Sequence, residues 1–423
     1  MRTVNGGRER RPAVPRDPTG GKRALVLCGG GITGLTYEIG ALRALDDILV
    51  GVSVNDFDMY VGTSAGSMVG ALLANGITPT ELALGLQGSN SKLAPPGRWT
   101  IYSPNLGELG SRAMRLPGLL REMAWEVARH PAKIPNTDVI AMLAPLLPSG
   151  LFDSGRLIDY FHRVLAEEGI ADDFRKLDRE LYLVACALDS GQRTVFSARR
   201  NGHVPISRAA AASSAVPMLF KPVRIDGIDY VDGGIKGNSA IDVAVDHGAT
   251  LIVVINPVVP VDARDLQMPR RARQQAGGDG GVRIADLGMK GIYNQVFRGM
   301  LHDGILDHIR LGRARKPDGD ILLIEPRPDD EKMFFHELMS FSARLMVMQH
   351  GYESVSNGLY DTWGYLRRIL PKHGVHITRR NIDRKPVQVP IESFDQPNLL
   401  SRLLRQTVFD RRPRVSVVDD QAV

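Results

Sequence analysis

The sequence of 423 residues has little cysteine, few aromatic residues and no long uninterrupted hydrophobic run. Two cysteines, Cys28 and Cys186, cannot build a disulfide framework or a four-cysteine zinc site, so we expect both to be buried thiols. The most apolar late stretch, residues 251–261, is broken by Asn256 and Pro257 and is too short to span a bilayer. The polar, proline-containing N-terminal segment lacks the apolar region of a secretory signal. We therefore expect a cytoplasmic protein rather than a disulfide-rich secreted or integral membrane protein.

Charge and composition leave several classes open. Hydrophobic residues make up 43% and charged residues 24% of the chain, which is typical of a soluble globular protein. The formal net charge of +6 is compatible with nucleic acid, anionic lipid or simple solubility. Much of the excess of basic residues lies near the two ends of the chain. These residues either form solvated tails or contact an anionic surface. These residues are Arg8, Arg10, Arg11, Arg16, Lys22, Arg23, Arg379, Arg380, Arg384, Lys385, Arg411, Arg412 and Arg414.

Hydrophobic patterning predicts an α/β fold. Short apolar runs followed by helix-like spacing favour parallel strands joined through helices, which gives three α/β/α layers around a mostly parallel sheet. The expected strands are 24–28, 57–61, 181–188, 194–197, 228–231, 251–255 and 321–324. We expect a flexible basic leader (1–21), a catalytic domain (22–256) with a helical cap at about 78–176, a mobile loop (257–290), a mainly helical completion (291–370) and a basic tail (371–423).

The first motif with chemical meaning is the glycine-rich turn Gly29-Gly30-Gly31-Ile32-Thr33-Gly34, between an expected strand and helix. Glycines at this position expose backbone N–H groups at the positive end of a helix dipole, where an anion can bind. The turn also matches the dinucleotide pattern G-x-G-x-x-G. That pattern expects an acidic residue at the far end of the next strand, whereas Asp56 and Asp58 begin it.

The second motif is Gly62-Thr63-Ser64-Ala65-Gly66, a G-x-S-x-G sequence between strand and helix. Its flanking glycines, Gly62 and Gly66, permit a sharp elbow that exposes a serine hydroxyl beside the amides of the following helix. An ordinary helix N-cap is the alternative interpretation of this serine. A nucleophilic serine needs a base.

Two kinds of base are available in the sequence. A Ser-His-Asp esterase would use a histidine, with the candidates His247, His302, His308, His336 and His350, none of which lies in a signature-like setting. The other candidate is Asp232, in Tyr230-Val231-Asp232-Gly233-Gly234, where an expected strand runs directly into two glycines. Taken alone, Asp-Gly-Gly is typical of a turn.

In this order on an α/β chain, the glycine turn, the serine elbow and the strand-end Asp-Gly-Gly resemble the patatin-like phospholipase family. The segment ASSAVPMLF, residues 212–220, also resembles a block of that family, and the resemblance covers about 23–256. It implies Ser64 as nucleophile, Asp232 as its partner in a Ser-Asp dyad, and the three glycines 29–31 as the oxyanion hole.

Two positions depart from the family pattern. Thr33 stands where many relatives have a basic residue, and Asn238 is followed by Ser239-Ala240 where many relatives read N-x-P. The resemblance implies a lipid acyl hydrolase, of phospholipase A or lysophospholipase type, that acts through a serine acyl-enzyme. It needs no metal and no cofactor.

The expected partner is a phospholipid or other acyl-ester lipid, reached by reversible, peripheral contact with a membrane surface, and no nucleic acid is expected. Apolar residues with helical spacing in the cap, namely Leu116, Leu120, Met123 and Val127 with Trp125 nearby, fit either an interfacial lid or an ordinary cap helix. Transacylation, a Ser-His-Asp esterase, a nucleotide-binding protein and a catalytically silent lipid-binding protein remain alternatives.

Overall fold

The computed structural model describes residues 21–89, 93–129, 147–167, 170–264, 283–335 and 338–379. The expected leader at 1–20, most of the expected loop at 265–282, and the tail from 380 onward lie outside these residues, as does His336. Within the described ranges, no helix combines the length and apolar character needed to cross a membrane.

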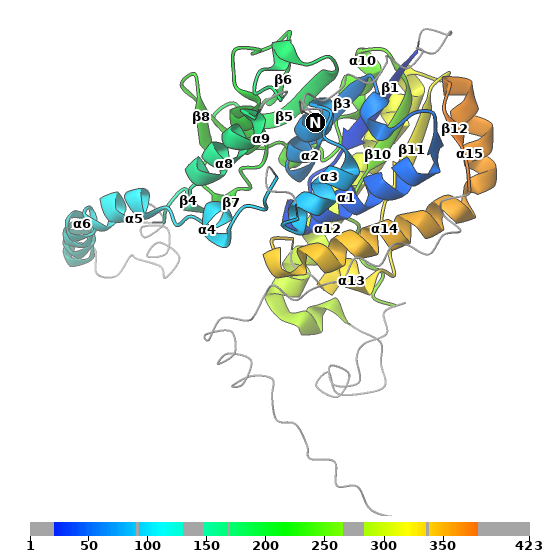
Figure 1. The fold of residues 1–423 in the computed structure, drawn as a ribbon. Coiled ribbons are helices and arrows are strands. Elements are labelled where there is room, and N and C mark those ends of the chain that lie inside the picture. The colour runs from blue at the N-terminus through cyan, green and yellow to red at the C-terminus, as the bar shows by residue number, and fades with distance from the viewer. Residues whose placement is uncertain are drawn as a thin grey trace, which may run out of the picture. The chain divides into compact units, whose positions relative to one another are not determined.

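A mostly parallel sheet forms the centre of the fold (Figure 1). Its strand order is β11-β10-β1-β3-β5-β9-β8, with β6 also paired to β5. The pairs along β11-β10-β1-β3-β5 are parallel, whereas β6, β9 and β8 join antiparallel. The strands are β1 (Lys22–Leu27), β3 (Met59–Thr63), β5 (Glu180–Ala187), β6 (Arg193–Phe196), β8 (Val223–Ile225), β9 (Ile228–Asp232), β10 (Ala249–Ile255) and β11 (Asp320–Ile324).

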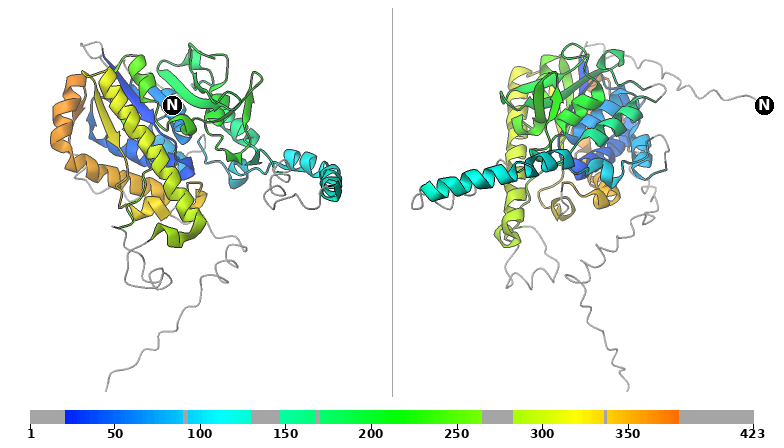
Figure 2. Two further views of the ribbon diagram at one scale, coloured as in Figure 1. Left: turned by 180° about the vertical axis from the view of Figure 1, so that it is seen from behind. Right: turned by 90° about the vertical axis from the view of Figure 1, so that its left-hand side faces the viewer.

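Helices cover both faces of the sheet (Figure 2). One face packs on α1 (Gly31–Ile48), α2 (Ala65–Ala74), α9 (Ile206–Ser213) and α14 (Arg344–Asp361), and the other on α10 (Ile241–Asp246) and α12 (Gly288–Arg315). The central strands are buried on both sides, which explains their continuous apolar sequences. The predicted three-layer α/β/α class is therefore confirmed.

The segment between β3 and β5 is mainly helical, as the prolines and periodicity of the sequence indicate. It contains α3 (Pro79–Leu86), α4 (Arg98–Ile101), α5 (Leu106–Ala113), α6 (Leu116–Arg129) and α8 (Gly155–Leu165). Leu116 and Trp125 of α6 are exposed, while the side chains of Leu120, Met123 and Val127 lie outside the described ones. The lid hypothesis therefore stays a prediction.

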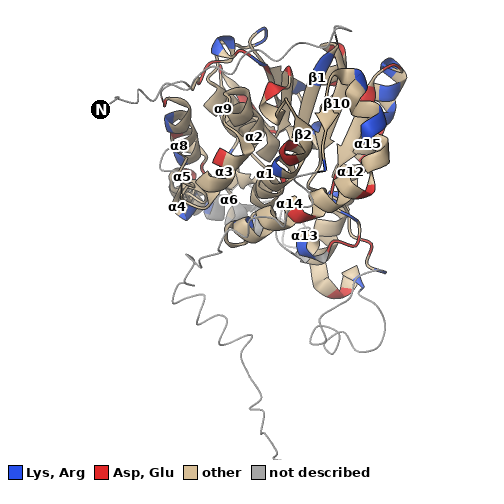
Figure 3. Ribbon diagram, turned by 45° about the vertical axis from the view of Figure 1, so that its right-hand side comes forward, with Lys and Arg blue, Asp and Glu red and all other residues tan. Residues whose placement is uncertain are grey.

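The chain after β10 is also largely helical. Besides α12 and α14 it holds α13 (Glu331–Phe335) and α15 (Trp363–Ile369), around the single predicted strand β11. Arg367 and Arg368 on α15 are exposed, so basic groups lie on this helix (Figure 3).

Sequence patterning missed several very short strands. β4 (Gly150–Phe152) pairs with β7 (Met218–Phe220), β2 (Leu49–Val50) pairs with β12 (His376–Ile377), and β8 forms a hairpin with β9. Strands of two or three residues contain little more than one two-residue repeat of inward and outward side chains, too few for a recognisable pattern. Their periodicity therefore gives no signal, and pairing with distant segments creates them.

Candidate active site

Ser64 occupies a sharp turn between β3 and α2. Its backbone has φ 53° and ψ −124°, a region that a residue with a side chain adopts only at a cost of about 1–3 kcal/mol. A Cβ on Gly62 would lie 2.5 Å from the Ser67 Cα, and one on Gly66 would lie 2.3 Å from the Leu27 carbonyl oxygen. Both glycines of G-x-S-x-G are therefore required by close backbone contacts, and the chain turns sharply at Ser64.

Asp232 ends β9 and is brought to Ser64 by the sheet. Residue 64 follows β3 and Asp232 pairs with Ala185 of β5, so the intervening strand β5 places the two side chains together. The Ser64 hydroxyl lies near enough to the Asp232 carboxyl group for its hydrogen bonding to lower the pKa of that group, and the Gly234 amide donates to Asp232 Oδ1 at 2.7 Å. Burial raises the pKa of Asp232 to about 6, against the lowering effect of these two hydrogen bonds.

Two adjacent serines hold the elbow in place. The Ser64 amide donates to Ser213 Oγ at 2.9 Å, and Ser213 Oγ in turn donates to the Val184 carbonyl at 2.6 Å. The Ser214 hydroxyl donates to the Ser64 carbonyl at 2.9 Å. These contacts satisfy buried backbone groups that the strained turn removes from regular secondary structure. They give the block 212–220 a physical role that its sequence alone did not reveal.

The glycine turn lies directly against Ser64. A Cβ on Gly29 would lie 2.8 Å from the Ser64 Cβ and 3.4 Å from its Oγ. The Gly29 amide donates to Asn238 Oδ1 at 2.7 Å, and Asn238 Nδ2 donates back to the Gly29 carbonyl at 3.0 Å. Within the described residues, the Gly30 and Gly31 amides have no hydrogen-bond acceptor. Asn238, which sequence reasoning noted only as part of a departing motif, thus ties the glycine turn to the loop that follows Asp232.

Thr33 is buried on the other side of the same turn. Its amide and its hydroxyl both donate to the Leu338 carbonyl, at 3.0 and 3.3 Å. A Cβ on Gly30 would lie 2.6 Å from the Pro257 side chain, at the end of β10. In place of the basic side chain that the family resemblance led us to expect, Thr33 is a small residue that anchors the turn to Leu338.

Each predicted histidine that the structure describes has a partner other than Ser64. His247 contacts the Val243 carbonyl at 2.8 Å, and His308 contacts the Ser239 carbonyl. His302 lies 3.1 Å from Glu325, whose hydrogen bond raises the pKa of His302, and His350 lies 2.6 Å from Asp330. The alternative base of a Ser-His-Asp arrangement therefore finds no support among these four residues, which include His302 on α12.

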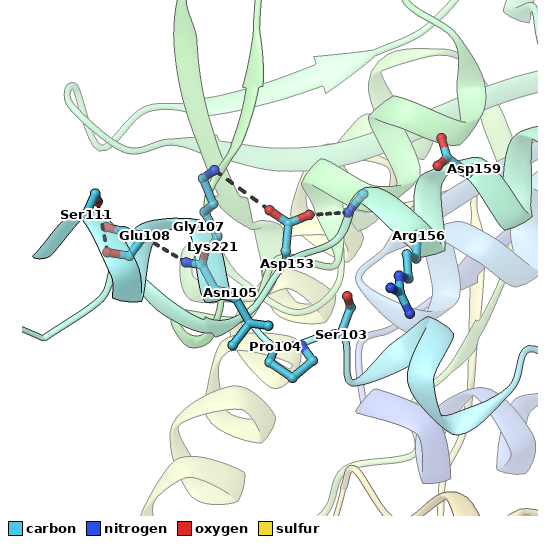
Figure 4. Close-up of a pocket in the computed structure, with 12 residues that line it drawn as sticks. Ser103, Pro104, Asn105, Gly107, Glu108, Ser111, Asp153, Arg156, Asp159 and Lys221 are labelled. Atoms are coloured by element: carbon cyan, nitrogen blue, oxygen red, sulfur yellow. Dashed lines mark hydrogen bonds and ion pairs between the residues drawn. The ribbon is translucent and has the colours of Figure 1, made fainter. Parts of the chain in front are cut away.

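An open polar pocket of about 660 Å³ lies at the base of the helical cap (Figure 4). Twelve residues line it, and neither Ser64 nor Asp232 is among them: Ser103, Pro104, Asn105, Leu106, Gly107, Glu108, Ser111, Asp153, Gly155, Arg156, Asp159 and Lys221. Asp153 contacts Lys221 at 3.8 Å and accepts from the Gly155 amide at 2.7 Å. These contacts partly neutralise the charges of Asp153 and Lys221, which both line the pocket.

Both cysteines are free and buried, as predicted, and burial raises the pKa of each thiol. In the part of the chain that the structure describes, no group of three or more His, Cys, Asp or Glu side chains is arranged to hold a metal ion.

The geometry of the glycine turn, the elbow and Asp232 agrees with a comparison against known families. The model of patatin-like phospholipases matches residues 25–245, just over half of the chain, and includes all three motifs. The chain belongs to the patatin-like phospholipase family. Within this patatin-like region lie the last three residues of β1 and every strand from β2 through β9.

Two curated relatives are similar to this patatin-like chain. It is 24% identical over 231 residues to the probable lipid hydrolase 463L of Invertebrate iridescent virus 6, which covers 53% of this chain and 64% of the viral protein. It is 26% identical over 241 residues to the uncharacterized protein YjjU of Escherichia coli, covering 56% of this chain and 52% of YjjU. The chain thus spans less than two thirds of either relative.

Solved structures give more distant likenesses. VipD from Legionella pneumophila aligns with a TM-score of 0.35 and 17% identity, covering 85% of this chain and 72% of VipD. The type III effector protein ExoU aligns with a TM-score of 0.34 and 15% identity, covering 80% of this chain and 53% of ExoU. The strand order of the chain itself, rather than these likenesses, defines its fold.

Proposed function

We propose that this protein is a lipid acyl hydrolase that cleaves carboxylic esters of phospholipids or lysophospholipids through a serine acyl-enzyme. The observation that carries the proposal is the position of Ser64, at a strained elbow, beside the buried carboxyl group of Asp232, whose pKa it lowers. Family membership and the name of the viral relative, a probable lipid hydrolase, support the lipid substrate class.

In the proposed reaction, Ser64 Oγ attacks the ester carbonyl carbon while its proton passes to Asp232. The tetrahedral intermediate then collapses, the C–O bond to the alcohol breaks, and Asp232 returns the proton to the leaving oxygen. Water, activated by Asp232, cleaves the acyl-enzyme and releases the fatty acid. An alcohol in place of water would give transacylation by the same steps.

The elevated pKa of Asp232 supports its proposed role as base. Aspartate with its ordinary pKa of 3.8 would be a weak base for a serine hydroxyl, and a pKa of about 6 brings it close to that of a histidine. The free-energy gain in proton affinity is about 3 kcal/mol. Burial at the end of β9 therefore restores most of the proton affinity that an aspartate base lacks relative to a histidine base.

We propose that the Gly30 and Gly31 amides are the donors that stabilise the oxyanion. The prediction from sequence included Gly29 among these donors. Because the Gly29 amide donates to Asn238, Gly29 in this proposal anchors the turn and does not donate to the oxyanion. Losing one oxyanion donor typically costs about 3–4 kcal/mol in catalysis, which makes the two amides the largest proposed contribution.

Labelling with a fluorophosphonate probe and hydrolysis of a soluble ester test this function together. We expect labelling of the wild type and of Ser190→Ala, a matched exposed serine, and no labelling of Ser64→Ala. Asp232→Asn should remove nearly all hydrolysis, and the double variant should be little worse, because residues that act as one unit are not additive.

Histidine variants decide between a dyad and a triad. Single substitutions of His247, His302, His308, His336 and His350 should leave folded proteins that retain most activity. A folded histidine variant as inactive as Ser64→Ala would replace the dyad with a triad. Absence of both labelling and hydrolysis in the folded wild type would instead favour a catalytically silent lipid-binding protein.

A further inference from the structure

The polar pocket at the base of the cap is formed by segments that backbone hydrogen bonds hold together. Its walls come from the segment 103–111, the start of α8, and Lys221, which directly follows β7. The Asp153 amide donates to the Ser103 carbonyl at 2.8 Å, and the Lys221 amide donates to the Phe152 carbonyl at 2.8 Å. The pairing of β4 with β7 lies between these bonds along the chain. Because backbone bonds set the positions of these segments, the pocket is largely pre-formed.

Ser103 carries a hydroxyl group that faces this pocket and is nearly buried. The residue is 9% exposed, and Figure 4 shows its hydroxyl directed into the space between the pocket walls. Across the described ranges of the chain, this hydroxyl has no hydrogen-bond partner. A buried polar group that stays unsatisfied costs about 1–3 kcal/mol. The pocket therefore offers a nearly buried donor to a polar group of a ligand.

Arg156 and Asp159 add two opposite charges that do not pair with each other. Both residues are exposed and line the pocket from α8, three positions apart, a spacing at which helix side chains can meet. In α12 the same spacing gives an ion pair, with Arg310 2.9 Å from Asp307. In Figure 4 the Arg156 and Asp159 side chains instead point to different sides, and neither charge has an ion-pair partner among the residues that the structure describes. One cation and one anion are thus available to a ligand.

The other charged groups of the pocket are already compensated. Glu108 pairs with Arg112 at 2.5 Å and accepts from the Ser149 hydroxyl at 2.7 Å. Asp153 lies 3.8 Å from Lys221. Since each of these two carboxylates has a cationic partner, the pocket has no excess of either sign. A neutral polar pocket with one available charge of each sign favours a zwitterion over a simple anion or cation.

We propose that this pocket binds a zwitterionic phosphodiester, such as a phosphocholine or phosphoethanolamine group. The phosphate accepts from the Arg156 guanidinium and from the Ser103 hydroxyl, and the amine contacts the Asp159 carboxylate. In these groups an ester oxygen and two carbons separate the phosphorus from the nitrogen. That span is comparable to the rise of about 4.5 Å over three helical residues, so both contacts are within reach of one ligand.

A lipid head group and a small soluble zwitterion share this chemistry. We assign the pocket to the head group of a phospholipid, an assignment that rests on the proposed function. The pocket and the elbow also share one segment of the chain. Lys221 directly follows the block 212–220, in which the Ser214 hydroxyl donates to the Ser64 carbonyl at 2.9 Å.

Titration of the full chain with glycerophosphocholine, followed by ligand-observed NMR, tests the site without catalysis. We expect saturable binding to the wild type and a loss of affinity of about tenfold for Arg156→Gln and for Asp159→Asn, because each removes a charge-assisted contact. Ser103→Ala should weaken binding by about fivefold, since it removes one hydrogen bond. The matched control is Arg200→Gln, an exposed arginine outside the pocket, which should bind like the wild type.

Three results of this titration would overturn the proposal. They are no saturable binding to the wild type, equal binding to Arg156→Gln and the wild type, and binding of inorganic phosphate or choline alone as tightly as glycerophosphocholine. The last result would show that the two charges do not act on one ligand.

Hydrolysis of two soluble substrates separates the two sources of the ligand. The substrates are a monomeric short-chain phosphatidylcholine and an ester of the same acyl chain without a head group. Arg156→Gln should raise KM for the phosphatidylcholine by about tenfold relative to KM for the second ester, with little change in kcat, whereas Arg200→Gln should leave this ratio unchanged.

The outcomes also distinguish this inference from the proposed function. Weakened binding of glycerophosphocholine by Arg156→Gln with an unchanged ratio of KM values would assign the pocket to a soluble zwitterion and overturn the lipid assignment. If the folded wild type hydrolyses neither substrate, the proposed function fails while the titration still tests the pocket.

Discussion

Replacing Asp232 with asparagine should stabilise the protein while it abolishes hydrolysis. Burial raises the pKa of Asp232 from 3.8 to about 6, so the folded protein binds this proton more tightly than the unfolded chain does. The free energy of unfolding therefore falls as pH rises from about 3.8 to about 6. Above that range the buried carboxylate is ionised, and the loss of stability has reached its full value. The difference in pKa corresponds to about 3 kcal/mol at pH 7.5.

Asparagine is neutral at every pH and can keep both local hydrogen bonds. Its oxygen can accept from the Gly234 amide, now 2.7 Å from Asp232 Oδ1, and its NH₂ group can donate to Ser64. We expect Asp232→Asn to gain up to about 3 kcal/mol at pH 7.5 and about half of that at pH 5. For the roughly 320 residues that the structure describes, 3 kcal/mol corresponds to a rise in Tm of roughly 4 to 5 °C.

Scanning fluorimetry at the two pH values measures the effect, with two controls. Ser64→Ala should lose activity without gaining stability, because it removes a hydrogen bond to the carboxylate. Asp229→Asn on the same strand lies 3.8 Å from Arg224 and is partly exposed, so its Tm should change little. No gain in Tm for Asp232→Asn at pH 7.5, or an equal gain at pH 5, would refute the argument that a buried charge is tolerated here for catalysis.

Three other expectations concern the catalytic rate on a soluble ester. The wild-type kcat/KM should fall about tenfold per pH unit below pH 6, because the base must be ionised; a profile that stays flat down to pH 5 would contradict Asp232 as base. Asn238→Ala should lower kcat by about tenfold to a hundredfold with little change in KM, since the glycine turn loses its anchor, and an equal rise in KM would speak against this role. Gly30→Ala should lower turnover because its Cβ would meet Pro257 at 2.6 Å, whereas Gly97→Ala, whose nearest neighbour would be 3.7 Å away, should not.

The sequence alone predicted the main strands and the layered fold, and its resemblance to the family singled out Ser64 and Asp232 as the proposed dyad. The strands β1, β10 and β11 each contain at least four consecutive apolar residues and are followed by glycine or a polar residue within two positions, so their signal is local. The requirement for glycine at position 62 is equally local, because a Cβ there would meet Ser67 of the same turn, whereas a Cβ on Gly66 would meet Leu27 of the neighbouring strand β1.

Only the tertiary structure determined how these pieces meet. Ser64 and Asp232 are far apart in the chain, and the position of β5 between their strands brings them together. The pKa of about 6 depends on how deeply packing buries Asp232, and the Gly29–Asn238 bonds join residues separated by 209 positions. The pocket at the base of the cap likewise combines Ser103, Arg156 and Lys221, which come from three separate segments. Contacts, burial and the walls of a pocket are properties of packing between distant segments, so no local pattern of residues encodes them.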